Sequence, residues 1–135
     1  MARPEHLTGI PTRFFADTGD IHEAEEAKSL MGFLDGVTTN PTLVKKNPEI
    51  AAKLERGEFL TLGQLRDAYK NIALGLSELV GPDGSVSLEV YADQTTTADE
   101  MFDDGKEMFP WIANAHIKYP LTRAGLAAAQ RSVLV

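Results

Sequence analysis

Four short apolar runs in the chain each end in one reactive or strongly polar side chain. These side chains are Asp17, Asn40, Glu89 and Lys118, and segments with helical periodicity separate the runs. Such an alternation of strands and helices predicts a parallel sheet whose active groups gather at the C-terminal ends of the strands. A lysine, two carboxylates and an amide at one edge are suited to carbonyl chemistry through a Schiff base.

The elements that must position these groups follow from the hydrophobic pattern. Strands are expected over residues 13–17, 36–39, 85–92 and 115–120, after an irregular lead-in over residues 1–12. Helices are expected over residues 21–33, capped by Asp20, then over 62–79 and 97–109, and from 123 onward. The pattern after Thr42 is weaker and predicts only a helical turn or two around residues 48–56.

Side chains alternate across a strand, so each predicted strand has two distinct faces. In the third strand Ser87 and Glu89 share one face and Leu88 points to the other, while His116 and Lys118 share a face of the fourth. Helices cover both faces of an open doubly wound sheet, so both of its faces should be apolar. Polar groups on one common face favour a closed barrel over a flavodoxin-like sheet. We expect one partial domain over residues 1–135, of class α/β and of the TIM-type (β/α) barrel.

Each candidate residue also has a simpler interpretation. Lys118 in a desolvated pocket would be partly a free amine that attacks ketones, but a strand-end lysine can also reach solvent. Asp17 could bond to its own turn, Glu89 could cap the next helix, and Asn40 before proline is a common turn device. His116 could carry a proton, although a hydrogen-bonded structural histidine is the interpretation we favour. The shared placement of these groups argues for a site.

Composition limits the possible partners. The formal net charge is −7, which argues against a nucleic-acid surface or an anionic membrane as partner. The chain has no cysteine, and no segment approaches the ~20 apolar residues that span a bilayer. The sequence therefore predicts a globular cytoplasmic protein.

A different class of enzyme shares one motif with this chain. Asp17-Thr18-Gly19 after an apolar strand resembles the retroviral-type aspartic proteases, which are short chains that dimerise to bring two aspartates together. That fold is nearly all β, whereas the segment after Asp20 has helical periodicity. The pattern therefore argues against a protease.

Taken together, the segments resemble the transaldolase family, including its small fructose-6-phosphate aldolase-like members. The matching pieces span residues 14–19, 35–43, 86–90 and 117–126, in the order and at the spacing of the family. They include the signatures Gly-Val-Thr-Thr-Asn-Pro and Lys-x-Pro-x-Thr-x-x-Gly-Leu. The resemblance covers about residues 12–129 and implies a (β/α)8 barrel that transfers a dihydroxyacetone unit between sugar phosphates.

The resemblance also implies a role for each candidate residue. Lys118 would form the Schiff base, and Asp17 would take the substrate hydroxyl proton as the carbon–carbon bond breaks. Glu89 would act through a water, as in the transaldolases proper; the fructose-6-phosphate aldolases have glutamine at that place. Asn40 would hold substrate hydroxyls, with Thr38 supporting it. Because the iminium is the electron sink, no metal or organic cofactor is implied.

Chain length is the main departure from the family. A complete barrel takes ~200 residues or more, whereas this sequence ends soon after its fourth predicted strand. The threonine, serine and phosphate-binding arginine that family members carry on later strands have no counterpart here. We therefore expect an N-terminal half-barrel of about four βα units, with open strand edges and an exposed apolar face. Such a chain would form a homo-oligomer or another association that completes the barrel, or be a catalytically inactive fragment with a structural role.

Overall fold

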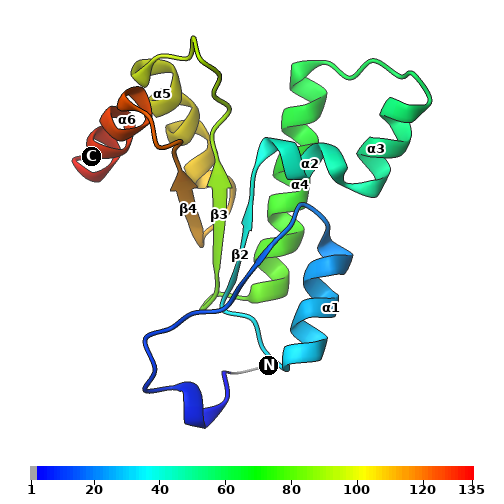
Figure 1. Cartoon of the computed structure of the whole chain (residues 1–135), viewed down its shortest axis with the longest axis vertical. Helices are drawn as coiled ribbons and strands as arrows, with labels where there is room; N and C mark the ends of the chain where they lie inside the picture. The colour runs from blue at the N-terminus through cyan, green and yellow to red at the C-terminus, as the bar shows by residue number, and fades with distance from the viewer. Residues whose placement is uncertain (1–2) are drawn as a thin grey trace.

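The computed structural model describes residues 3–135, which fold around one four-stranded parallel sheet (Figure 1). The strands pair in chain order: β1 (Phe15–Asp17), β2 (Gly36–Thr39), β3 (Ser85–Glu89) and β4 (Ala115–Lys118). A flavodoxin-like sheet reverses its strand order, whereas successive units of a (β/α) barrel add strands in sequence. The expected α/β class is confirmed, and the sheet is consistent with part of a TIM-like barrel.

Helices connect the strands and cover one side of the sheet. They are α1 (Ile21–Met31), α2 (Pro41–Lys46), α3 (Pro48–Glu55), α4 (Leu62–Val80), α5 (Ala98–Met108) and α6 (Arg123–Val133), with 3-10 helices η1 (Glu5–Leu7) and η2 (Phe109–Trp111). In Figure 1, α1 lies beside α4, and α5 packs with α6 next to β4. Within residues 3–135 no helix is both long and apolar enough to cross a membrane.

Several element ends differ from those expected. Strands β3 and β4 end at Glu89 and Lys118, earlier than residues 92 and 120, and helix α1 ends at Met31 because Gly32 adopts a left-handed φ of 78°. The predicted lead-in lies within the described residues from position 3 onward and contains η1. Residues 1–2 of that lead-in lie outside them.

Among the α-helices of the described residues, α2 is the one that the pattern missed. Asn40 caps it by accepting a hydrogen bond from the Leu43 N–H at 2.9 Å, and Pro41 occupies its first turn. An asparagine cap followed by proline is a known signal for a helix start, because proline has no N–H to leave unpaired there. With only six residues, α2 is too short to show helical periodicity.

The two faces of the sheet differ as the alternation predicted. Val37, Val86 and Leu88 have no exposed surface and pack toward the helices. On the opposite face Phe15 and His116 are exposed. Apart from Phe15, the described side chains of that face are polar, and exposed apolar side chains lie elsewhere, for example Leu126 and Val133 of α6.

The aspartic protease interpretation is also wrong. The Asp20 side chain accepts a hydrogen bond from the His22 N–H at 2.9 Å and starts helix α1 immediately after the Asp17-Thr18-Gly19 turn. The sheet that contains Asp17 is parallel in every pair. The motif belongs to a strand-to-helix connection.

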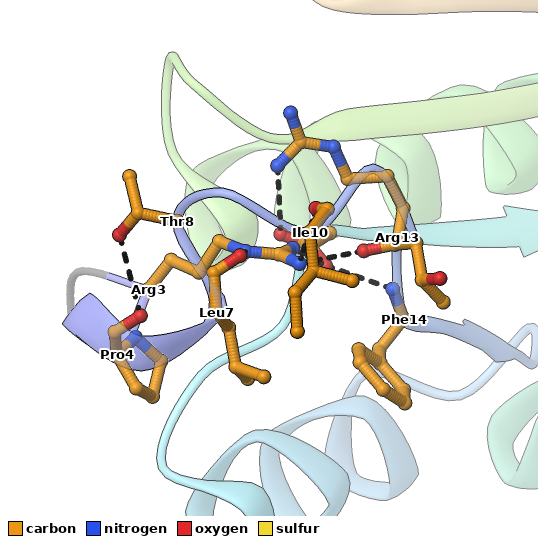
Figure 2. Close-up of polar contacts among 9 residues, drawn as sticks. Arg3, Pro4, Leu7, Thr8, Ile10, Arg13 and Phe14 are labelled. Atoms are coloured by element: carbon orange, nitrogen blue, oxygen red, sulfur yellow. Dashed lines mark hydrogen bonds and ion pairs between the residues drawn. The ribbon is translucent and has the colours of Figure 1, made fainter.

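The lead-in segment folds back onto the N-terminal end of the sheet through a partly buried ion pair (Figure 2). Arg3 binds Asp35, and its guanidinium also donates to the carbonyl oxygens of Leu7 at 3.0 Å and Thr12 at 2.6 Å. Asp35 accepts a further hydrogen bond from the Phe14 N–H at 2.8 Å. Although burial alone would raise it, the pKa of Asp35 is lowered by these hydrogen bonds and by the positive charges around it.

We expect Asp35→Asn to destabilise the protein at pH 7 by roughly 1–3 kcal/mol, because Arg3 then loses its charged partner. The folded pKa of Asp35 lies below its unfolded value, so its contribution is complete above about pH 3.9 and is lost as the pH falls through the folded pKa. Urea unfolding at several pH values between 3 and 7 should therefore show the difference from wild type shrinking at the acidic end. The exposed Asp103→Asn is the charge-matched control, and a difference that does not change with pH would contradict the assignment.

Candidate active site

Lys118 and Glu89 form an ion pair at the C-terminal ends of neighbouring strands. The parallel register places Glu89 of β3 directly opposite Lys118 of β4, and Nζ lies 3.0 Å from Oε2. Their side chains are 38 % and 30 % exposed. The desolvated lysine suggested by the sequence is therefore not seen; its ammonium is paired and open to one side.

Asp17 and Thr38 form the second pair, two residues nearer the N-terminal ends of the strands than Glu89 and Lys118. They are also opposite each other in register, on β1 and β2, and Thr38 Oγ1 donates a hydrogen bond to Asp17 Oδ1 at 2.7 Å. This bond fixes one oxygen of the carboxylate and leaves the other for a ligand. Thr38 thus supports Asp17, whereas the resemblance implied that it supports Asn40.

Asn40 caps a helix and also lines a cavity. Its Oδ1 caps helix α2, so the turn interpretation is correct for that atom. The residue also lines a cavity of about 330 Å³ together with Asp17 and Glu89. The side-chain nitrogen is therefore the part of Asn40 that remains for a ligand.

This cavity collects the polar ends of three strands. Lys45 of α2 and Tyr91, which follows β3, complete its charged and aromatic lining. Thr38 and Lys118 are outside the lining, but each bonds to a carboxylate that belongs to it. The volume is within the range of small-molecule sites. The structure thus brings all five candidate residues into one region.

His116 lies on the face of Lys118 but is engaged elsewhere. Its Nδ1 is 2.7 Å from Ser85 Oγ, at the N-terminal end of β3. This is the hydrogen-bonded histidine that the sequence favoured, and its partner Ser85 lies at the start of the strand that Glu89 ends.

Sequence reasoning missed the side chains that support the cavity from behind. The hydroxyl of Tyr69 on α4 contacts the backbone of Glu89, and its ring packs edge-to-face on Trp111 with centroids 5.8 Å apart. The Arg66 guanidinium carbon lies over the Trp111 ring, 5.1 Å from the ring centroid. Burial raises the pKa of Tyr69 well above its ordinary value. Helical spacing placed Tyr69 on a core-facing stripe, but no local signal links it to a residue 20 positions away.

Comparison with known proteins gives this arrangement a family. The family model "Transaldolase/Fructose-6-phosphate aldolase" matches residues 14–132. The chain belongs to this family. All five candidate residues fall inside the matched range.

Curated relatives agree with the family assignment. The chain is 39 % identical over 116 residues to a probable transaldolase of Chlorobium phaeobacteroides, 40 % identical over 116 residues to one of Exiguobacterium sibiricum, and 33 % identical over 119 residues to one of Streptococcus agalactiae. These alignments cover 86 %, 86 % and 88 % of this chain but 45 %, 43 % and 44 % of the relatives. The chain thus spans less than half the length of these relatives.

The exposure of the Lys118–Glu89 pair predicts that it contributes little to folding. We expect Lys118→Met and Glu89→Gln each to change the free energy of unfolding by less than about 1 kcal/mol, as for other ion pairs near solvent. Leu88→Ala, at a position with no exposed surface on the same strand, should cost about 2–5 kcal/mol. Urea unfolding measures all three. A loss in the charge variants as large as that of Leu88→Ala would make the pair a structural element.

Proposed function

We propose that this chain performs transaldolase-type chemistry: transfer of a dihydroxyacetone unit between sugar phosphates through a Schiff base at Lys118. The Nζ amine attacks the keto carbon of the donor, and loss of water gives the iminium. Glu89, 3.0 Å from Nζ, accepts the proton that the ammonium must lose and acts on the water that leaves and later returns. Such a reaction belongs to carbohydrate metabolism, in the pentose phosphate pathway of the cytoplasm.

Carbon–carbon cleavage needs a base at some distance from the amine, because it acts on a hydroxyl further along the substrate. Asp17 is suited to this step: the Thr38 hydrogen bond orients its carboxylate, and the residue lines the cavity. When Asp17 takes the hydroxyl proton, the bond breaks and its electron pair flows into the iminium. The resulting enamine attacks the acceptor aldehyde, and hydrolysis restores the lysine. The Asn40 side-chain nitrogen would donate to substrate hydroxyls.

The observation that carries this proposal is the Lys118–Glu89 pair beside a cavity that Asp17 also lines. Lys118 is outside the lining of that cavity, but the carboxylate that it binds on the neighbouring strand belongs to it. An amine, an acid and a separate base around one cavity supply the groups for imine formation and carbon–carbon cleavage.

The test is reduction with borohydride in the presence of fructose 6-phosphate, followed by intact mass and peptide mapping. We expect an adduct on Lys118 in the wild type and none in Lys118→Met, because the amine is lost. The mass separates two steps: a six-carbon phosphorylated adduct reports the imine, and a three-carbon adduct reports cleavage. Asp17→Asn should keep the first adduct and lose most of the second.

Lys106→Met provides the matched control, since Lys106 is an exposed lysine on α5, away from the cavity. It should give the wild-type adduct. A well-folded wild type that gives no adduct would contradict the proposal and favour the alternative, a catalytically inactive half-barrel with a structural or interaction role.

We also propose that the chain associates through its sheet edges. Within residues 3–135, β1 pairs only with β2 and β4 only with β3, so one edge of each outer strand is open. Open parallel edges recruit further strands, and a second copy of this chain would supply them in the same architecture. Phe15, 42 % exposed on the face opposite the helices, would become buried.

Light scattering with size-exclusion chromatography tests this association, and we expect a mass at least twice that of one chain. Phe15→Ser should shift the distribution toward monomer, because it weakens the apolar part of the interface. Phe109→Ser, at another exposed phenylalanine on the helix side, is the control and should leave the mass unchanged. A stable, well-folded wild-type monomer would overturn the association.

A further inference from the structure

Glu89 occupies the place where β3 loses its neighbour. The β2–β3 register runs from Gly36 opposite Ser85 to Thr39 opposite Leu88, and the Ser85 N–H bonds to the carbonyl of Asp35. In a parallel pair each residue of one strand bonds to residues two apart on its partner. Continued by this rule, the register assigns the Glu89 carbonyl to the N–H of residue 41.

Residue 41 is proline and has no N–H to donate. The carbonyl of Glu89 therefore has no ladder donor on the β2 side, in the same residue whose side chain pairs with Lys118. A buried carbonyl without a donor is costly, and a strand end that pairs on one side only is free to shift.

Tyr69 supplies the missing donor. Its hydroxyl donates to the Glu89 carbonyl at 3.2 Å and accepts from the Glu89 N–H at 2.9 Å. One side chain thus binds both backbone groups of one residue. Burial raises the pKa of Tyr69 above its ordinary value, so the hydroxyl is protonated at neutral pH and can donate and accept at once.

The tyrosine itself is held rigidly. Only 7 % of Tyr69 is exposed, and its ring packs on Trp111, over which the Arg66 guanidinium lies. Arg66 pairs with Asp104 at 2.5 Å, and Asp104 accepts the Tyr91 N–H at 3.1 Å. The same cluster therefore holds β3 at Glu89 and the chain two residues beyond it.

We propose that Tyr69 is a positioning residue that fixes the backbone of Glu89 and so aims its carboxylate at Lys118. This inference rests on the proposed Schiff-base function, because the geometry matters only if the two side chains act together. Helix α4, which lies on the outer layer, would then control the rate of imine formation although it does not contact the substrate.

The test compares Tyr69→Phe with Ser77→Ala. Ser77 lies on the same helix and donates one partly buried hydrogen bond, to Asn114 Oδ1 at 2.8 Å, so both variants lose a hydroxyl from α4. The rate of borohydride-trapped adduct formation is measured against fructose 6-phosphate concentration. We expect Tyr69→Phe to lower the maximal rate roughly 10- to 100-fold with the half-saturating concentration unchanged, because misplacement of a reacting group affects the chemical step.

Ser77→Ala should keep the wild-type rate despite a similar loss of stability, which separates positioning from folding. Equal maximal rates in the two variants would overturn the proposal while leaving the Schiff base intact. Amide hydrogen exchange by NMR gives a second readout that needs no turnover: in Tyr69→Phe the Glu89 N–H should exchange at least tenfold faster, and the Val90 N–H, bonded to the Lys118 carbonyl, should not. If the wild type forms no adduct, the proposed function fails and this exchange decides the backbone role; unchanged exchange at Glu89 overturns it.

Discussion

The parallel register between β3 and β4 is the constraint on which the site depends. It sets Glu89 opposite Lys118, and a slip of one residue would send one of them to the face that packs on helices. Val86 and Leu88, both without exposed surface, prevent such a slip. Exposing either would cost about 1.5–3 kcal/mol. Residues that do no chemistry therefore fix the distance between those proposed to do it.

The ends of the strands impose a second constraint. Reactive groups are useful where the ladder stops, because there they reach a ligand, but backbone groups lose their partners at the same place. Three side chains satisfy them: Asn40 caps α2, Tyr69 binds Glu89 and Asp104 binds the Tyr91 N–H. The outer helices thus stabilise the site edge directly and do more than cover the core.

A structural feature could be predicted from the sequence when the residues that cause it are close together in the chain. The alternation of Ser87, Leu88 and Glu89 fixed the faces of β3, and the runs that end in Asp17 and Lys118 were correctly predicted as strands. Helix α2 was missed because six residues show no period, although its asparagine–proline start was visible.

Long-range contacts lay beyond any pattern in the sequence. The contact of Tyr69 with Glu89 joins a helix to a strand across 20 positions and depends on how far α4 leans over the sheet. Arg3, in a segment expected to be irregular, pairs with Asp35, 32 positions away and directly before β2. The sequence also left open whether Lys118 is desolvated or reaches solvent, since burial depends on every element around a residue and not on its own strand.

The charges around the cavity bear on two separate properties, reaction at a carbonyl and binding of a phosphate. Asp17 and Glu89 are balanced by Lys45 and Lys118, so the described residues near the cavity carry no excess positive charge, and the chain as a whole has a net charge of −7. A phosphate dianion is held best by several cationic donors, above all by bidentate arginine. In the proposed reaction Lys118 would not serve as such an anchor, because it would lose its proton to attack a ketone. The described groups around the cavity therefore match the proposed chemistry at the carbonyl better than they match firm binding of a phosphate.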